Sequence, residues 1–164
     1  MLSSKPRRRR AANPAPRAEQ SDPESSVAVD YEVLARFRYE LRKFQAFSKA
    51  AAEKNGLSPQ QHQAMLTIKG FSSEGPISVG DLAEFLLIRH HTAVELVNRM
   101  VKLKLLSRTV DAADGRRVFV TLTREGEVRL HKLSRIHFDE LRAIGPTLTR
   151  ILKPFRPSGS REPD

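Results

Sequence analysis

The fold of this chain is decided by the stretch Asp111-Ala-Ala-Asp-Gly-Arg-Arg-Val-Phe-Val-Thr-Leu-Thr-Arg-Glu-Gly126. Its apolar residues recur at every second position over 118–122, which is typical of a β-strand. Asp114-Gly115 is a strong hairpin signal, so residues 107–110 are expected to pair with this strand. The stretch therefore predicts a two-stranded hairpin whose tip carries adjacent arginines.

Two helices with clear start signals are predicted before the hairpin. Ser58 and Gln61, on either side of a proline, form a capping box that opens a short helix ending at Gly70. Ser78 and Asp81 repeat this signature and open a second helix, which ends near residue 86. Each helix is too short to be stable alone and needs packing partners.

A third helix is predicted over residues 90–103, after a short turn at 87–89. One side of it is apolar, and its outward face is polar. The residues expected on the buried side are Ala93, Leu96, Val97 and Met100. Two short helices joined by a tight turn, the second with a polar outward face, form a helix-turn-helix.

Two longer amphipathic helices are predicted to flank this region. The first, at 29–54, has an apolar stripe that fits either packing on its own domain or a dimer interface. The second starts at the cap Thr123 and is expected to break at Gly145-Pro146, before a final short helix at 147–153. The residues predicted for dimerisation are Leu34, Phe37, Leu41, Phe44, Ile144, Leu148, Ile151 and Leu152.

The predicted domain organisation has one ordered region, 29–153, in which residues 58–122 form the winged helix-turn-helix lobe. Residues 29–54 and 123–153 form dimerisation helices, which makes the fold mainly α with a small β-hairpin wing. Residues 1–28 and 154–164 have the composition of disordered segments. The run Arg7 to Arg10 fits either a flexible DNA-binding arm or a solvated charge cluster.

Composition narrows the function. The formal net charge is +10, which favours a polyanionic partner such as nucleic acid or an anionic membrane. The chain has no cysteine, which rules out disulfides and thiolate metal sites and fits the cytoplasm. No apolar run approaches membrane-spanning length, and the basic start is not followed by an apolar signal-peptide core. No nucleotide-binding loop, nucleophile motif or suitably spaced histidine pair appears, so we expect no enzyme, cofactor or metal site.

Residues 58–126 resemble the MarR family of bacterial transcriptional regulators. The quoted stretch follows that family's wing pattern of D-x-R-D-x-R, a short strand and then L-T-x-x-G. Ile77-Ser-Val-Gly-Asp-Leu-Ala83 and Val97-Asn-Arg-Met100 support the likeness. The chain departs from the family in two places. Ala112 and Ala113 replace larger, often basic residues, and Lys104 stands where the family commonly ends its recognition helix with glycine, so either Lys104 is left-handed or the helix ends differently.

The resemblance implies a homodimer with interdigitating terminal helices that binds a pseudo-palindromic operator in double-stranded DNA. Many members release DNA when a small, often phenolic, effector binds between the dimer helices and the DNA-binding lobe. The resemblance thus implies a sequence-specific regulator of the repressor type that a small-molecule effector releases from DNA. An alternative is a winged-helix module for protein contacts that has only non-specific DNA affinity.

The predicted DNA contacts lie on the third helix and at the wing tip. Residues 89–117, which include both, contain seven Lys or Arg and only three Asp or Glu. The predicted contacts are Arg89, His90, His91, Thr92, Val94, Glu95, Asn98, Arg99, Asp114, Arg116 and Arg117. Arg116 is the strongest candidate, with Asp114 orienting it. Arg99 could instead form a structural ion pair, and Lys102 and Arg108 are expected to add only non-specific attraction. An effector pocket could include Phe44, Phe47, His62 and Met65, although core packing explains these residues as well.

Overall fold

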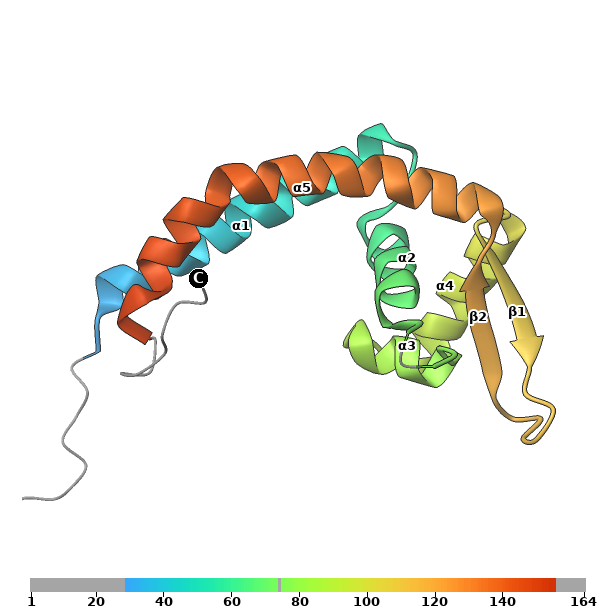
Figure 1. Cartoon of the computed structure of the whole chain (residues 1–164). Helices are drawn as coiled ribbons and strands as arrows, with labels where there is room; N and C mark the ends of the chain where they lie inside the picture. Colours follow the sequence, from blue (N-terminus) through green and yellow to red (C-terminus); the bar gives the residue numbers. More distant parts are fainter. Residues whose placement is uncertain (1–28, 74, 156–164) are drawn as a thin grey trace, which may run out of the picture. The chain divides into compact units, whose positions relative to one another are not determined.

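The structure is a computed structural model that describes residues 29–73 and 75–155 (Figure 1). Its elements in chain order are α1 (Tyr31–Lys54), α2 (Pro59–Phe71), α3 (Val79–Phe85), α4 (His90–Lys102), β1 (Leu106–Val110), β2 (Val118–Leu122), α5 (Arg124–Leu152) and the 3-10 turn η1 (Lys153–Phe155). The predicted fold class is confirmed: helices dominate, and one antiparallel hairpin follows α4. The run Arg7 to Arg10 lies outside the described residues.

The helix starts form where the sequence predicts them. The Ser58 hydroxyl accepts a hydrogen bond from the Gln61 backbone N–H at 3.2 Å, and the Gln61 side chain accepts from the Ser58 N–H at 2.8 Å. Ser78 and Asp81 make the same reciprocal pair at 3.1 and 2.9 Å. Each box satisfies two backbone donors that a helix start otherwise leaves unpaired, which fixes the first turns of α2 and α3.

The wing consists of β1, β2 and the loop at 111–117. Its register pairs Leu106 with Leu122, Arg108 with Val120 and Val110 with Val118. Directly paired residues share a face, and Val120 is buried, so this set faces the helices. The Val120 N–H also donates to the Ile77 carbonyl at 2.9 Å, which joins the wing to the start of α3.

A single core lies between α2, α3, α4 and the wing and extends to the adjoining parts of α1 and α5. All four residues predicted for the buried side of α4 belong to it. Its largest fully buried apolar side chains are Met65, Leu82, Leu96, Met100, Leu105, Leu106 and Leu133. This core holds α4 and the wing in a fixed relation.

Helices α1 and α5 lie side by side (Figure 1). His137 of α5 hydrogen-bonds through Nε2 to the Ser48 hydroxyl of α1 at 2.9 Å. No helix among the described residues is long and apolar enough to cross a membrane.

The predicted break at Gly145-Pro146 is wrong, because α5 continues through both residues to Leu152. A proline in a helix restricts the residue before it through a clash that involves that residue's Cβ, and Gly145 has none. The helix loses only the bond to the Arg142 carbonyl, and Arg142 is exposed, so water can replace it. Ile151, beyond the proline, is buried, so packing favours continuing the helix.

Among residues 29–73 and 75–155, two residues other than glycine have a left-handed backbone. Lys104 has φ 58° just after α4, so the first of the two predicted alternatives for this position holds. The Leu105 N–H then bonds the Met100 carbonyl at 3.0 Å, which turns the chain sharply into β1. Leu87, with φ 54°, makes the turn between α3 and α4, and nothing in the sequence analysis anticipated it.

Candidate nucleic-acid interface

The outward face of α4 is polar and accessible. Of the residues predicted to contact DNA there, Arg89, His90, His91, Glu95 and Arg99 are exposed. Val94 is 37% exposed, while Thr92 and Asn98 are half-buried. Arg99 has no ion-pair partner among residues 29–73 and 75–155, so its structural alternative gains no support. The outward face of α4 thus offers hydrogen-bond donors and acceptors beside the apolar side chain of Val94.

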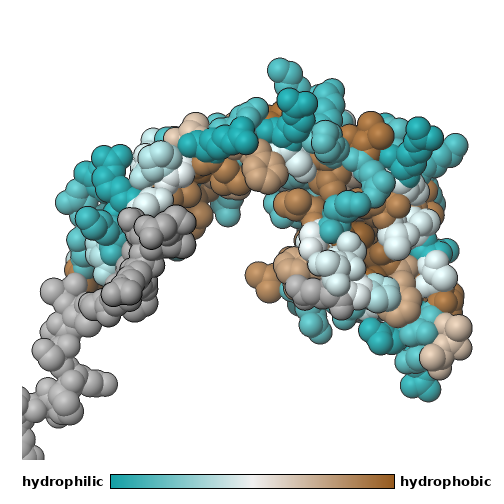
Figure 2. Space-filling model, viewed as in Figure 1, coloured by the Kyte–Doolittle hydropathy of each residue, from teal (hydrophilic) through white to brown (hydrophobic). Residues whose placement is uncertain are grey.

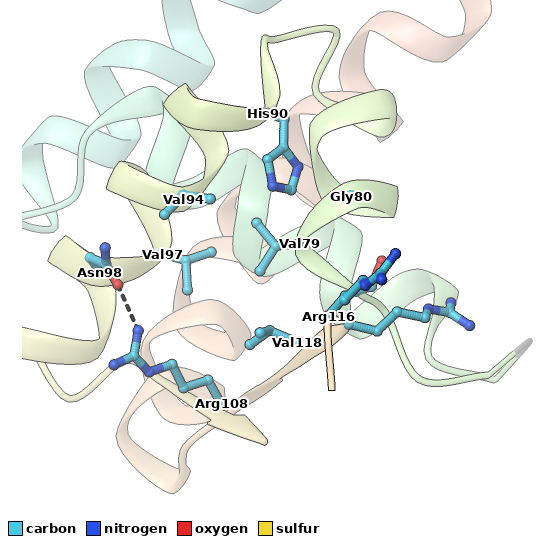
Figure 3. Close-up of a pocket in the computed structure, with 11 residues that line it drawn as sticks. Val79, Gly80, His90, Val94, Val97, Asn98, Arg108, Arg116 and Val118 are labelled. Atoms are coloured by element: carbon cyan, nitrogen blue, oxygen red, sulfur yellow. Dashed lines mark hydrogen bonds between the residues drawn. The ribbon is translucent and has the colours of Figure 1, made fainter. Parts of the chain in front are cut away.

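A hollow of about 280 Å³ separates α4 from the wing (Figure 3). Its floor is apolar and includes Val79, Val94, Val97 and Val118. The rest of its lining consists of Gly80 and of polar or positively charged residues, namely Ser78, His90, Asn98, Arg108, Arg116 and Arg117. A duplex that approached α4 would therefore meet the helix, the hollow beside it and the positively charged wing tip.

The wing tip is held by hydrogen bonds of its own aspartates. The Asp111 carboxylate accepts from the Ala113 N–H at 2.9 Å, and Asp114 accepts from the Arg116 N–H at 3.0 Å. Asp114 thus orients Arg116 through the backbone. Within the part of the chain that is described, the Arg116 guanidinium has no ion-pair partner, which leaves it available to an external anion.

Arg117 has a different environment. Its guanidinium lies 4.0 Å from the Asp81 carboxylate and 5.3 Å from the centre of the Phe119 ring. The pKa of Asp81 is lowered chiefly by the Ser78 backbone hydrogen bond; burial opposes this effect, and the Ser78 hydroxyl and the charge of Arg117 add smaller lowering effects. Asp81 is therefore an anion near the start of α3, with Arg117 beside it.

Arg108 is the residue whose position sequence reasoning missed. Its Nη1 donates to Asn98 Oδ1 at 2.8 Å, a bond drawn in Figure 3. The strand alternation places Arg108 on the same face as Leu106, whereas the expectation that it adds only non-specific attraction stays a prediction. That face looks toward α4.

Aromatic rings gather where α1, α2 and α5 meet. His62 and His137 have ring centres 4.5 Å apart, and Phe44 and Phe47 present their edges to His137. Burial, and secondarily His137, lower the pKa of His62 to about 4, and His62 Nδ1 is buried without a hydrogen-bond partner. Met65, also considered for an effector pocket, is fully buried in the core.

No group of three or more His, Asp or Glu among the described residues could hold a metal ion. Both histidine nitrogens of His137 have partners: Nε2 bonds Ser48, and Nδ1 lies 2.9 Å from the Leu133 carbonyl.

The comparisons with known proteins agree with this geometry. Residues 55–117 match the profile of the MarR family, so the resemblance found in the sequence is confirmed over this segment. The family consists of DNA-binding transcription regulators rather than enzymes, in line with the expectation of no catalytic activity. No curated protein matches the chain.

Solved structures share the fold. MepR, a transcription regulator of the Staphylococcus aureus multidrug efflux pump MepA, is 19% identical with a TM-score of 0.62, over 78% of this chain and 100% of MepR. An S. aureus MepR–DNA complex is 23% identical with a TM-score of 0.53, over 75% and 98% of the two chains. NadR in complex with 4-hydroxyphenylacetate is 22% identical with a TM-score of 0.61, over 79% and 88%. These likenesses establish a MarR-type winged helix fold.

Proposed function

Because residues 55–117 match the MarR family and the fold agrees, we propose that this chain is a sequence-specific regulator that binds double-stranded DNA. One observation carries the proposal: the polar face of α4 lies beside a wing whose tip arginine, Arg116, has no ion-pair partner in the described residues. Helix α4 would enter the major groove, whose width accepts an α-helix. Arg116 would reach the backbone or the adjacent minor groove, where the negative potential favours arginine.

A mobility-shift assay tests this function. The labelled probe is the DNA upstream of the gene that encodes the chain, and unrelated duplex is present as competitor. Retention of the probe against excess competitor supports the regulator. Binding that is lost equally to any duplex, or that disappears at physiological salt, would instead support a winged-helix protein-interaction module with only non-specific DNA affinity.

We also propose that the regulator is a homodimer. Several large apolar side chains of α1 and α5 remain exposed in the single chain, notably Leu34 and Leu41 of α1 and Phe138, Leu141 and Leu152 of α5. Among the residues predicted for dimerisation, Leu34, Leu41 and Leu152 are exposed, Phe37, Phe44, Ile144 and Leu148 are half-buried, and Ile151 is buried. A second copy would cover this surface, and its twofold axis would match a pseudo-palindromic operator.

A small aromatic effector is the remaining part of the proposal. NadR binds 4-hydroxyphenylacetate in its solved complex. In this chain Phe44 and Phe47 contact His137 where α1, α2 and α5 meet, and His137 lies against His62, whose Nδ1 has no hydrogen-bond partner among the described residues. These rings and this nitrogen would suit an aromatic molecule with a hydrogen-bonding group. We propose that such a ligand releases the DNA and that the chain acts as a repressor. Release of a bound operator duplex by 4-hydroxyphenylacetate, with His62→Leu as the unresponsive variant, tests this step.

A further inference from the structure

A side-chain pair links the recognition helix to the wing. Arg108 of β1 donates from Nη1 to Oδ1 of Asn98 in α4, at 2.8 Å. Arg108 is exposed and Asn98 is half-buried, and both line the hollow between α4 and the wing (Figure 3). The hydrogen bond therefore lies at the surface that α4 offers to a partner.

The local structure explains why the two residues meet. Arg108 pairs with Val120, so it projects from the face of the hairpin that looks toward the core and α4. Asn98 lies one residue after buried Val97, on the polar side of the helix. The guanidinium thus bridges the gap that separates the two elements.

The chemistry of the pair fixes the orientation of the Asn98 amide. A guanidinium has five N–H donors and no acceptor, so only the amide oxygen can bond it. The Asn98 Nδ2 group, a donor, then points away from Arg108. Together, the Nδ2 hydrogens and the remaining guanidinium hydrogens form a surface made mainly of donors, beside the one lone pair that Oδ1 keeps.

This surface matches one base edge in the major groove. Guanine presents two acceptors there, N7 and O6, whereas adenine presents the acceptor N7 beside the donor N6 amino group. An unengaged asparagine reads adenine, because its oxygen accepts from N6 while its amide nitrogen donates to N7. With the oxygen already accepting from Arg108, the adenine amino group would meet the guanidinium charge beside an acceptor that has only one lone pair left.

Resting on the DNA-binding function proposed above, we propose that Asn98 and Arg108 act as one guanine-reading unit and that Arg108 determines this specificity by engaging Asn98 Oδ1. Arg108 is then a specificity-determining residue, although it lies in the wing strand and not in the recognition helix. The pair would contact one guanine in each half-site of the operator.

A binding selection tests the proposal. Full-length protein and its Arg108→Ala variant are each incubated with a library of duplexes that contain a random central segment, and the bound DNA is sequenced. Wild type is expected to select guanine at one position in each half-site. Exchange of that guanine for adenine should weaken wild-type binding roughly 10- to 100-fold in a titration. In Arg108→Ala the freed Asn98 amide should shift the preference at that position to adenine.

Two further variants complete the test. Asn98→Ala/Arg108→Ala should select no base at this position, because both reading groups are gone. Lys102→Ala removes an exposed positive charge from the same helix and should weaken binding to all sequences alike. If Arg108→Ala keeps the wild-type guanine and merely binds every sequence more weakly, like Lys102→Ala, the inference is wrong. If wild type selects no sequence at all, the proposed DNA-binding specificity itself fails, and the two failures are thereby distinguished.

Discussion

Neighbouring arginines at the wing tip have different surroundings, and each is therefore expected to contribute differently. Arg117 is held near Asp81 and the Phe119 ring, whereas the guanidinium of Arg116 has no ion-pair partner in the described part of the chain. A cation already paired with a carboxylate gains less from a phosphate than an unpaired one does. The wing pattern already favours Arg116, and the structure adds that Arg117 lies beside a carboxylate and an aromatic ring.

We expect Arg116→Ala to weaken DNA binding about tenfold and to lower the slope of log affinity against log salt by about 1, because one cation–phosphate contact disappears. Arg117→Ala serves as the matched control, since it removes the same charge one residue away, and should reduce affinity less. Fluorescence anisotropy titrations at several salt concentrations measure both effects. Equal losses in the two variants would remove any special role for Arg116.

The buried His62 predicts how stability depends on pH. Its pKa is lowered from 6.5 to about 4. Between these pH values the His62 ring therefore binds a proton in the unfolded chain but not in the folded chain. The free energy of unfolding should therefore be unaffected by His62 above pH 6.5 and fall between pH 6.5 and 4, by at most about 3 kcal/mol.

Denaturant titrations across this pH range measure the loss, and the variant His62→Leu isolates it. The variant should show a flatter profile between pH 6.5 and 4, because it lacks the titrating group and also places no unpaired nitrogen in the core. His131→Gln, at an exposed histidine of α5, is the control and should keep the wild-type profile. A His62→Leu profile as steep as that of wild type would contradict the assignment.

At the level of elements, α5 packs closely against the turn that precedes β1, and this contact depends on a glycine. A Cβ at Gly126 would fall on the backbone carbonyl of Leu105, well inside van der Waals contact. The same Leu105 carbonyl accepts from the Thr123 N–H at 3.0 Å, and the Thr123 hydroxyl donates to the neighbouring Lys104 carbonyl at 2.6 Å, so this segment has little freedom to move. This contact gives a physical reason for the glycine in the L-T-x-x-G pattern.

Gly126→Ala is accordingly expected to lower the free energy of unfolding by at least about 2 kcal/mol. Gly70→Ala is the matched control, because Gly70 lies inside α2 and an added Cβ would meet nothing within 4 Å. That change should raise stability by about 0.5–1 kcal/mol, since alanine favours the helix. Chemical denaturation of both variants decides the matter, and a Gly126→Ala protein as stable as wild type would refute the steric argument.

Elements with local signals were predictable from the sequence. The two capping boxes, the strand alternation and the buried side of α4 depend on residues a few positions apart, and the structure agrees with each. The break at Gly145-Pro146 was predicted wrongly because packing around α5 outweighs the local preference of proline. The left-handed Leu87 gave no signal, because a turn fixed by two packed helices can impose a backbone that leucine itself disfavours.

The candidate site was predictable only in outline. Period and charge indicated the face of α4 and the wing tip, since both follow from short-range pattern. The partners of individual side chains were not predictable, because Arg108 and Asn98, or Arg117 and Asp81, meet only when separate elements pack together. The roles of neighbouring arginines therefore follow from tertiary structure.

For the whole molecule, the exposed apolar residues of α1 and α5 require an explanation that a single chain does not supply. Phe138 is 63% exposed, and Leu141, Leu148 and Leu152 follow it at helical spacing along α5. Figure 2 shows hydrophobic residues along the α1–α5 pair. Exposed apolar side chains in such a row mark an association surface, and α1 and α5 would exchange contacts with the same helices of a second copy.

Phe138→Glu is expected to convert the dimer into a monomer at micromolar concentration, raising the dimer Kd by roughly 100-fold or more, because each twofold-related copy would bury an unpaired carboxylate. Val128→Glu is the control: Val128 is 60% exposed on the same helix but lies outside the row, so this variant should stay dimeric. Sedimentation velocity measures both, with circular dichroism to verify folding.

Since α4 of one subunit can fill only one half-site, the folded monomer should also lose most of its affinity for a two-half-site duplex, while its affinity for a single half-site stays that of the wild-type lobe. A wild-type chain that sediments as a monomer would refute the dimer, and a Phe138→Glu dimer would move the interface away from this row.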